Sequence, residues 1–210
     1  MKETIIHKAL TANFIPAISA LVLISAISPF GGVYAMHHLQ GEEKPTAKIQ
    51  IEAAEQVIEA FYSFDSATLA PLLRQAGDSS ANILYYQGWA EGGNYKVVTR
   101  TPCFIEEPNK IACAITVQDD PVVALNTGFN VTDTFHMTFD GANLTAVETS
   151  SNDQPIYYEA RQWVEANRPE VMTGPCKDAY AGGTTPGDCA RAMTEGYTEF
   201  YKTVVVPRSN

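Results

Sequence analysis

The sequence lacks the short motifs that identify several large enzyme classes. It contains no G-x-S-x-G nucleophile motif, no H-E-x-x-H metal motif, no glycine-rich phosphate loop and no dinucleotide-binding fingerprint. Its four cysteines include no close C-x-x-C pair and its four histidines are scattered, so we expect neither a metal site nor a cofactor. The 14 lysines and arginines form no cluster, which argues against a nucleic-acid partner.

Residues 1–35 have the layout of a secretory signal peptide. Two lysines precede an apolar run over residues 14–30, and Val33 and Ala35 supply the small residues expected before a cleavage site. The run is near the lower length limit for crossing a bilayer, so we favour a cleaved signal over an uncleaved membrane anchor. The sequence therefore predicts a secreted or periplasmic protein that begins near Met36 and is not stably inserted in a membrane after cleavage.

Export would place the four cysteines in an oxidising compartment, where they are expected to form disulfides. Cys103 and Cys113 lie symmetrically about Pro108, so a hairpin loop there would bring their Cα atoms to about 4.5 Å, within the disulfide range. Cys176 and Cys189 would close a glycine-rich loop. We favour these two local pairs over the other possible pairings and over free buried thiols.

The spacing of apolar residues divides the rest of the chain into a leader, helices and strands. Glycine, proline and charged residues over 36–49 indicate a flexible leader. The expected elements are three helices between residues 51 and 92, two antiparallel hairpins over residues 96–118 and 130–150, and further helices from residue 155 onward. Three helices followed by a meander of antiparallel strands predict an α+β fold.

The end of the first helix and the last hairpin carry a resemblance to a known superfamily. Ala60-Phe61-Tyr62-Ser63-Phe64-Asp65 and residues 134–147 resemble the nuclear transport factor 2-like superfamily, which includes polyketide cyclase (SnoaL-like) and ketosteroid isomerase-type proteins. The resemblance covers residues 50–151. It implies a cone-shaped half barrel of curved antiparallel sheet packed on N-terminal helices, an apolar cavity, and a homodimer formed through the sheet's outer face. Residues 152–210 lie outside this pattern and form a disulfide-closed helical extension.

Strand alternation assigns the side chains of the last hairpin to two faces. Asp133, Phe135 and Met137 share the face expected to meet the core and the cavity, whereas His136 faces the surface or a dimer contact. Desolvation at the open end of an apolar lining should raise the pKa of Asp133, which makes it the candidate acid-base group. The alternative is a solvated aspartate at a strand end. Glu148 is a second candidate inward carboxylate or a rim residue.

Aromatic residues on the predicted helices are the candidate ligand contacts. Tyr62, Tyr86 and Trp89 could stack on a ligand or form hydrogen bonds to it at the cavity mouth. Aromatic residues at helical spacing are also ordinary core residues, and this alternative stays open. We therefore expect Tyr62, Tyr86 and Trp89 to bind a ligand together with Phe135 and Met137.

Two classes of function follow from these residues. One is an exported domain that binds a small apolar molecule, and the other is a cofactor-independent acid-base enzyme that uses Asp133, acting as an isomerase, cyclase, dehydratase or epoxide hydrolase. An enzyme requires at least two convergent polar groups with perturbed pKa values, whereas a binding protein can have one or none. Because the sequence offers only Asp133, we prefer the binding function.

Overall fold

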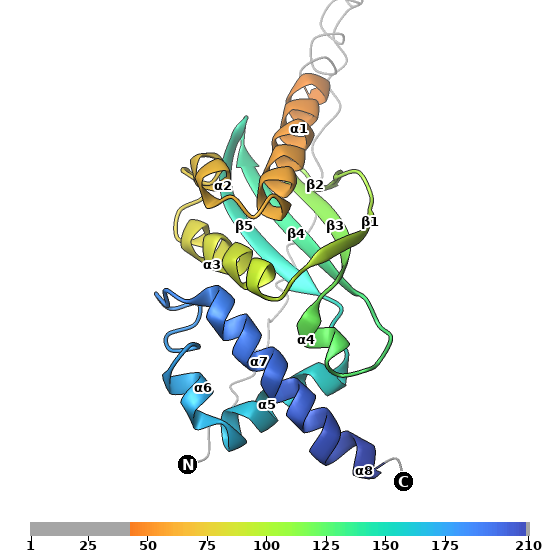
Figure 1. Cartoon of the computed structure of the whole chain (residues 1–210). Helices are drawn as coiled ribbons and strands as arrows, with labels where there is room; N and C mark the ends of the chain where they lie inside the picture. The colour runs from red at the N-terminus through yellow and green to blue at the C-terminus, as the bar shows by residue number, and fades with distance from the viewer. Residues whose placement is uncertain (1–42, 209–210) are drawn as a thin grey trace, which may run out of the picture. The chain divides into compact units, whose positions relative to one another are not determined.

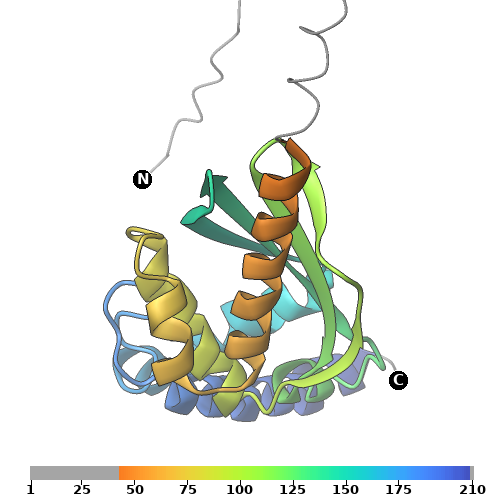
Figure 2. The same cartoon turned by 90° about the horizontal axis from the view of Figure 1, so that it is seen from above.

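Helices and an antiparallel sheet make up residues 43–208, the part of the chain that the computed structural model describes (Figure 1). The predicted α+β class is confirmed, and the sheet is curved and does not close on itself (Figure 2). The predicted signal peptide lies outside the described residues. Within them, no helix combines the length and the apolar character needed to cross a bilayer.

The structure forms its elements in the predicted order. They are α1 (Glu43–Tyr62), α2 (Ser66–Leu72), α3 (Ser79–Gly92), β1 (Lys96–Arg100), β2 (Phe104–Glu107), β3 (Lys110–Gln118), α4 (Asp120–Val123), β4 (Val131–Asp140), β5 (Asn143–Ser151), α5 (Pro155–Asn167), α6 (Pro169–Thr173), α7 (Pro186–Phe200), the π-helical turn η1 (Tyr201–Val205) and α8 (Val206–Arg208).

The first helix begins earlier than its apolar period predicts. It starts at Glu43 rather than at Ile51, so part of the predicted leader is helical. A tertiary contact supports this added segment at its end: the buried Gln50 side chain donates to the carbonyl of Gly141 at 2.7 Å and to Asn109 Oδ1 at 3.2 Å. These partners lie in the turns of the two hairpins, and contacts so distant in sequence leave no periodic signal.

The sheet has the order β1-β3-β4-β5, with β2 also paired to β3. Ile105 pairs with Ile111, as the symmetry of the first hairpin predicts. The expected single strand before Pro108 is interrupted between β1 and β2 at residues 101–103. Pro102 lies in this break and has no backbone N–H for the ladder, which is why the strand cannot continue.

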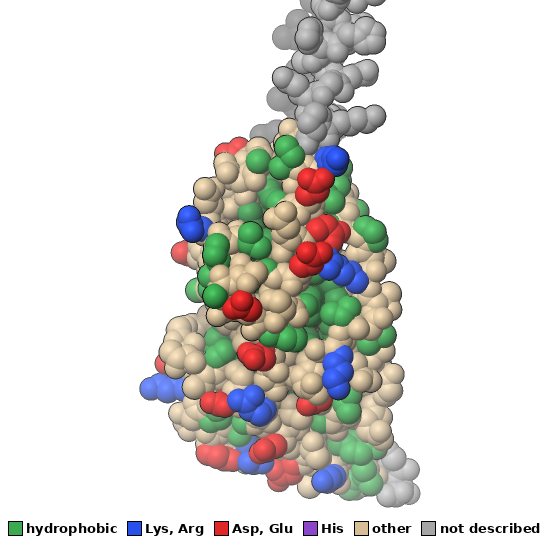
Figure 3. Space-filling model, turned by 45° about the horizontal axis from the view of Figure 1, so that its top comes forward, with side chains coloured by type: hydrophobic (Ala, Val, Ile, Leu, Met, Phe, Trp, Pro, Cys, Tyr) green, Lys and Arg blue, Asp and Glu red, His purple; other side chains and the backbone are tan. Residues whose placement is uncertain are grey.

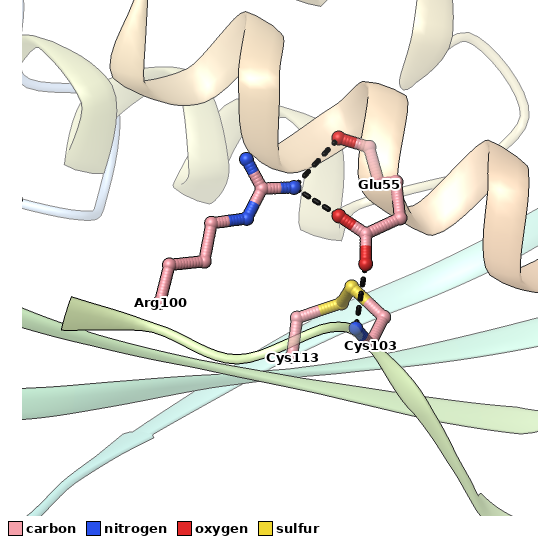
Figure 4. The surroundings of a disulfide bond; sticks show 4 residues. All are labelled: Glu55, Arg100, Cys103 and Cys113. Carbon is pink, nitrogen blue, oxygen red and sulfur yellow. Dashed lines mark hydrogen bonds and ion pairs between the residues drawn. A yellow bond between two sulfur atoms is a disulfide. The ribbon is translucent and has the colours of Figure 1, made fainter.

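Both predicted disulfides are present. The Cα atoms of Cys103 and Cys113 are 4.3 Å apart, and those of Cys176 and Cys189 are 4.6 Å apart. Figure 4 shows Glu55 reaching from α1 to the first pair: its carboxylate forms an ion pair with Arg100 and accepts the Cys103 N–H at 2.6 Å. Two disulfides indicate an oxidising compartment, which supports an extracellular or periplasmic location.

Two clusters of buried side chains form the core. The first joins α1–α3 to one face of the sheet, where the rings of Phe61 and Phe135 meet edge-on at 4.9 Å. The second joins the end of α3 to α5, α6 and α7. Figure 1 shows α7 running past α3, α4 and α5, which it contacts. The described part of the C-terminal extension, residues 152–208, therefore shares a core with α3.

Helices α3 and α7 approach backbone to backbone. A Cβ atom built on Gly92 would lie 2.3 Å from Gly187 Cα and 2.4 Å from Gly187 O, and one built on Gly88 would lie 2.5 Å from Pro186 Cγ. Only glycine permits this approach on the α3 side. The contact fixes the start of α7 relative to the rest of the second core.

Acidic and basic side chains are interspersed on the described surface that Figure 3 displays. Several belong to ion pairs between exposed groups, such as Arg191 with Asp188 at 2.6 Å and Lys48 with Glu52 at 3.7 Å. Exposed pairs of this kind contribute little to stability. The folding free energy therefore depends mainly on the two cores and the disulfides.

Candidate functional site

A cavity of about 620 Å³ lies between the sheet and the C-terminal helices, a volume in the range of small-molecule sites. Its walls come from α3, α4, the start of β4, the outer strand β5, and residues of α5, α6 and α7, with Asp119 just after β3. The disulfide between Cys176 and Cys189 forms part of the wall. Residues 152–210 thus build a large part of the site, although the resemblance leaves them outside the common domain.

Strand β4 carries Asp133 into this cavity. Burial alternates along the strand as predicted, and the Asp133 side chain is 3% exposed. Burial raises the pKa of this carboxyl to about 6, the neighbouring Tyr86 hydroxyl opposes part of the rise, and the Asp153 charge adds to it. The predicted direction of this pKa shift is confirmed, and the alternative of a solvated aspartate is wrong. Its Oδ2 atom has no hydrogen-bond partner among the described residues.

Asp119 is a second buried carboxyl group that sequence reasoning missed. It follows β3 and caps α4, where its Oδ1 accepts the backbone N–H of Val122 at 2.8 Å. The pKa of Asp119 is raised to about 7. Burial is the main cause and the Asp133 charge adds to it, whereas the hydrogen bond from Val122 N–H lowers the pKa in part. Its Oδ2 is also unpaired. An aspartate two positions before Pro121 at a strand end is a helix-cap signal that could have located it.

Tyrosines also lie at the cavity, and two of them, Tyr86 and Tyr95, interact with the buried carboxyl groups. Tyr86, Tyr95, Tyr157 and Tyr197 all line the cavity. Burial raises the pKa of each phenol above its ordinary value, so all four are neutral at physiological pH and can donate a hydrogen bond. The rings of Tyr157 and Tyr197 meet edge-on at 5.3 Å, and those of Tyr86 and Tyr95 at 6.2 Å.

The predicted ligand contacts divide into two groups. Tyr86 and Trp89 line the cavity, as expected. Phe135 and Met137 do not, because α1 covers their face of the sheet, and neither does Tyr62, which lies at the end of α1 and packs against the same first core. Phe135 and Met137 are fully buried there, with 0% exposure. The cavity begins further along the sheet, at the strand ends that α1 leaves uncovered.

His136 and Glu148 lie on the opposite face of the sheet from Asp133. His136 faces away from the cavity, as predicted, and its ring nitrogens contact Glu106 Oε2 and Ser150 Oγ, each at 2.9 Å. Glu148 pairs with His136 across the strands, because a register shift after Thr138 reverses the alternation along β5. The prediction that Glu148 points inward is therefore wrong. Its exposed side chain lies at the cavity rim, which was the alternative prediction.

The cavity is lined by more acidic than basic groups. Five carboxyl groups line it, and Arg161 is the one Lys or Arg among its described lining residues. The Arg161 side chain is itself paired with Glu165 at 3.1 Å. Within residues 43–208, no three His, Cys, Asp or Glu side chains are placed to hold a metal ion. The buried Asp119 and Asp133 thus border the cavity without a paired Lys or Arg among the described residues.

Comparison with protein-family models and with curated protein sequences yields no match. Among solved structures, a de novo designed β-sheet protein determined by solution NMR is similar over 53% of this chain and 92% of its own, with 11% identity and a TM-score of 0.36.

Proposed function

We propose that this chain is an exported protein that binds a small molecule in the cavity between the sheet and helices α5–α7. The observation that carries the proposal is a cavity of about 620 Å³ lined by aromatic rings and by two buried carboxyl groups with unpaired oxygens. Apolar lining favours an apolar body in the ligand, and a few convergent polar groups would fix its orientation.

We also propose that α1–α3 and the sheet form the cone-shaped half barrel of the nuclear transport factor 2-like superfamily. The support is the order of elements, three helices and then a curved antiparallel sheet, with one sheet face packed on α1. The C-terminal helices would then form the closure of the open end. Dimerisation through the outer face of the sheet stays a prediction of the resemblance.

Intrinsic fluorescence provides a direct test of binding. The chain has two tryptophans, of which Trp89 lines the cavity and Trp163 does not. In the variant Trp163→Phe, titration with the neutral dye Nile red is expected to quench Trp89 in a saturable way, with one dye per chain. Trp89→Phe leaves Trp163 as the sole tryptophan and is expected to show no saturable quenching. Linear quenching of equal slope in both variants would contradict the proposal.

A second candidate function is acid-base catalysis, and the pair of buried carboxyl groups favours it. Asp119 and Asp133 have raised pKa values and line one cavity, which meets the requirement for two convergent perturbed groups. A carboxyl with a pKa near 6 or 7 can both accept and donate a proton at physiological pH. Asp133 would exchange the proton with the substrate, and Asp119 or a tyrosine would donate a hydrogen bond to the developing charge.

The enzymatic alternative makes a separable prediction for any small molecule that is turned over. Asp133→Asn is expected to lower kcat by roughly 10²–10⁴ with little change in ligand affinity, because the proton-transfer group is lost at nearly constant volume. His136→Ala is the control and is expected to keep both quantities, since its ring lies on the other face of the sheet. Loss of turnover in His136→Ala alone would rule out Asp133 as the acid-base group.

A further inference from the structure

We propose that the ligand of this cavity is an amphiphilic amine, whose protonated nitrogen binds the unpaired carboxylate oxygens that face the cavity and whose apolar body contacts the aromatic walls. This inference rests on the proposed binding function and specifies its ligand class. Three observations carry it: the charge balance of the lining, the unpaired oxygens of two buried carboxyl groups, and the aromatic rings around them.

The charge balance excludes an anionic ligand and favours a cationic one. Asp78, Glu148 and Asp153 are further carboxyl groups of the lining, beyond the two buried ones. Arg161, the one basic residue of the described lining, forms an ion pair with Glu165, so the five carboxyl groups outnumber it. A carboxylate or phosphate ligand would therefore enter a field of its own sign, whereas an ammonium group would be attracted to it.

The two buried carboxyl groups have a binding capacity that the fold leaves unused. Asp133 pairs with Ile115 of β3 across the two strands. Asp119 lies four residues after Ile115 and therefore points to the same face of the sheet. Both aspartates line the same cavity. Each has an Oδ2 atom without a donor. A buried carboxylate oxygen without a donor is costly, and an ammonium group offers up to three charge-assisted hydrogen bonds.

Among the described residues, the groups that interact electrostatically with Asp133 are all acidic, and the cations Arg100 and Arg161 act on the tyrosines beside it. The groups that influence the charge of Asp133 or are influenced by it are Tyr62, Tyr86, Tyr95, Asp119, Asp153 and Tyr180, from α1, α3 and the segments that border the cavity. Asp120 and Asp153 act on Asp119 in the same direction. All of these groups are acidic, so a bound cation would be the compensating charge.

Aromatic rings provide the rest of the recognition. Tyr86 and Trp89 from α3 line the cavity together with Tyr157 from α5 and Tyr197 from α7. The negative face of an aromatic ring attracts an ammonium group, and the same rings cover an apolar body. Cavities that combine aromatic rings with carboxylates are suited to organic cations more than to metal ions, whose ligands must converge at short distances.

The dependence of affinity on pH separates this ligand class from a neutral one. Burial raises the pKa of Asp133 to about 6 and that of Asp119 to about 7, so both ionise between about pH 5 and about pH 8. An amine remains protonated over this range and binds the ionised carboxylates, so its affinity must rise with pH. A neutral carbonyl compound would accept hydrogen bonds from the protonated carboxyls, so its affinity must fall.

Isothermal titration calorimetry with three probes of matched shape tests the proposal. The sample is the full protein, expressed with export so that both disulfides form. The probes are 4-phenylbutylamine, 4-phenylbutan-1-ol and 4-phenylbutyrate. The amine is expected to bind at least about tenfold more tightly than the alcohol near pH 7.5, and the carboxylate more weakly than both. Amine affinity should rise from about pH 5.5 to about pH 8. Binding near pH 6.5 should release protons, detected as a dependence of the enthalpy on the buffer.

Single substitutions test which carboxyl groups bind the ammonium group of the probe. Asp133→Asn and Asp119→Asn should each reduce the amine's advantage over the alcohol by several-fold, and Asp140→Asn, an exposed aspartate on the same strand β4, should leave it unchanged. Thermal unfolding of each variant confirms that it is folded. Equal affinity for amine and alcohol, amine affinity that falls as pH rises, or full amine affinity in both cavity variants would overturn the inference. If Nile red and all three probes fail to bind saturably, the binding function itself is wrong.

Discussion

Replacing Gly92 with alanine is expected to destabilise the protein by about 3 kcal/mol or more and to abolish ligand binding. The added Cβ would lie 2.3 Å from Gly187 Cα and 2.4 Å from Gly187 O, and neither backbone atom can rotate away as a side-chain end could. The start of α7 must therefore move off α3. Because α7 supplies Met193 and Tyr197 to the cavity, the site should be lost with the packing. Urea unfolding and Nile red titration measure the two effects.

Two further variants show whether the effect comes from this contact. Glu91→Ala changes the exposed neighbouring residue and is expected to leave stability within about 0.5 kcal/mol. Gly196→Ala introduces a Cβ that meets Val164 Cγ2 at 2.5 Å, an obstacle made of side-chain atoms. Adding Val164→Ala should therefore offset part of its cost. A Gly92→Ala variant as stable as the parent, with intact binding, would show that residues 152–210 do not depend on this contact.

The parts of the structure that the sequence predicted depend on short-range geometry. Strand alternation alone predicted that Asp133 is buried and His136 is not, because neighbouring side chains of a strand point to opposite faces. The symmetry of a hairpin about Pro108 likewise predicted that Cys103 pairs with Cys113. Neither inference requires knowledge of how distant segments pack.

The parts that could not be predicted depend on contacts between distant segments. Phe135 and Met137 share the face of Asp133, yet α1 covers them and leaves Asp133 at the cavity. A register shift in the last hairpin reversed the expected facing of Glu148. The cavity itself exists because α7 packs on α3 at Gly92, and a single glycine in a helix end indicates a cap as readily as a helix contact.

Asp119 shows how the missed residue changes the functional reading. With Asp133 alone, the sequence favoured a simple apolar pocket. With Asp119 on the same cavity, the site contains two carboxyl groups of raised pKa, and both acid-base chemistry and recognition of a cation become chemically reasonable. The pH dependence of ligand affinity then shows whether the protonated or the ionised carboxyl groups bind the ligand.

The protein without ligand is expected to lose stability as the pH rises from about 4 to about 7, and to level off above this range. Burial raises the pKa values of Asp133 and Asp119 from 3.8 to about 6 and about 7, so the folded state holds protons that the unfolded chain has released. Stability from these groups is fully present below the unfolded pKa and is lost as the pH passes through the folded values. A tenfold difference in proton affinity between the folded and unfolded states corresponds to about 1.4 kcal/mol, so the total loss of stability amounts to several kcal/mol.

Asp119→Asn is expected to remove the larger part of this dependence and to raise the free energy of unfolding near pH 8, with little change near pH 4. Asparagine keeps the hydrogen bond from Val122 N–H that caps α4, so the substitution removes only the ionisable group. His136→Ala is the necessary control, because it removes an ionisable side chain outside the cavity that pairs with Glu106. Urea unfolding at a series of pH values measures each slope. The assignment fails if the parent grows more stable toward pH 8, or if His136→Ala rather than Asp119→Asn flattens the curve.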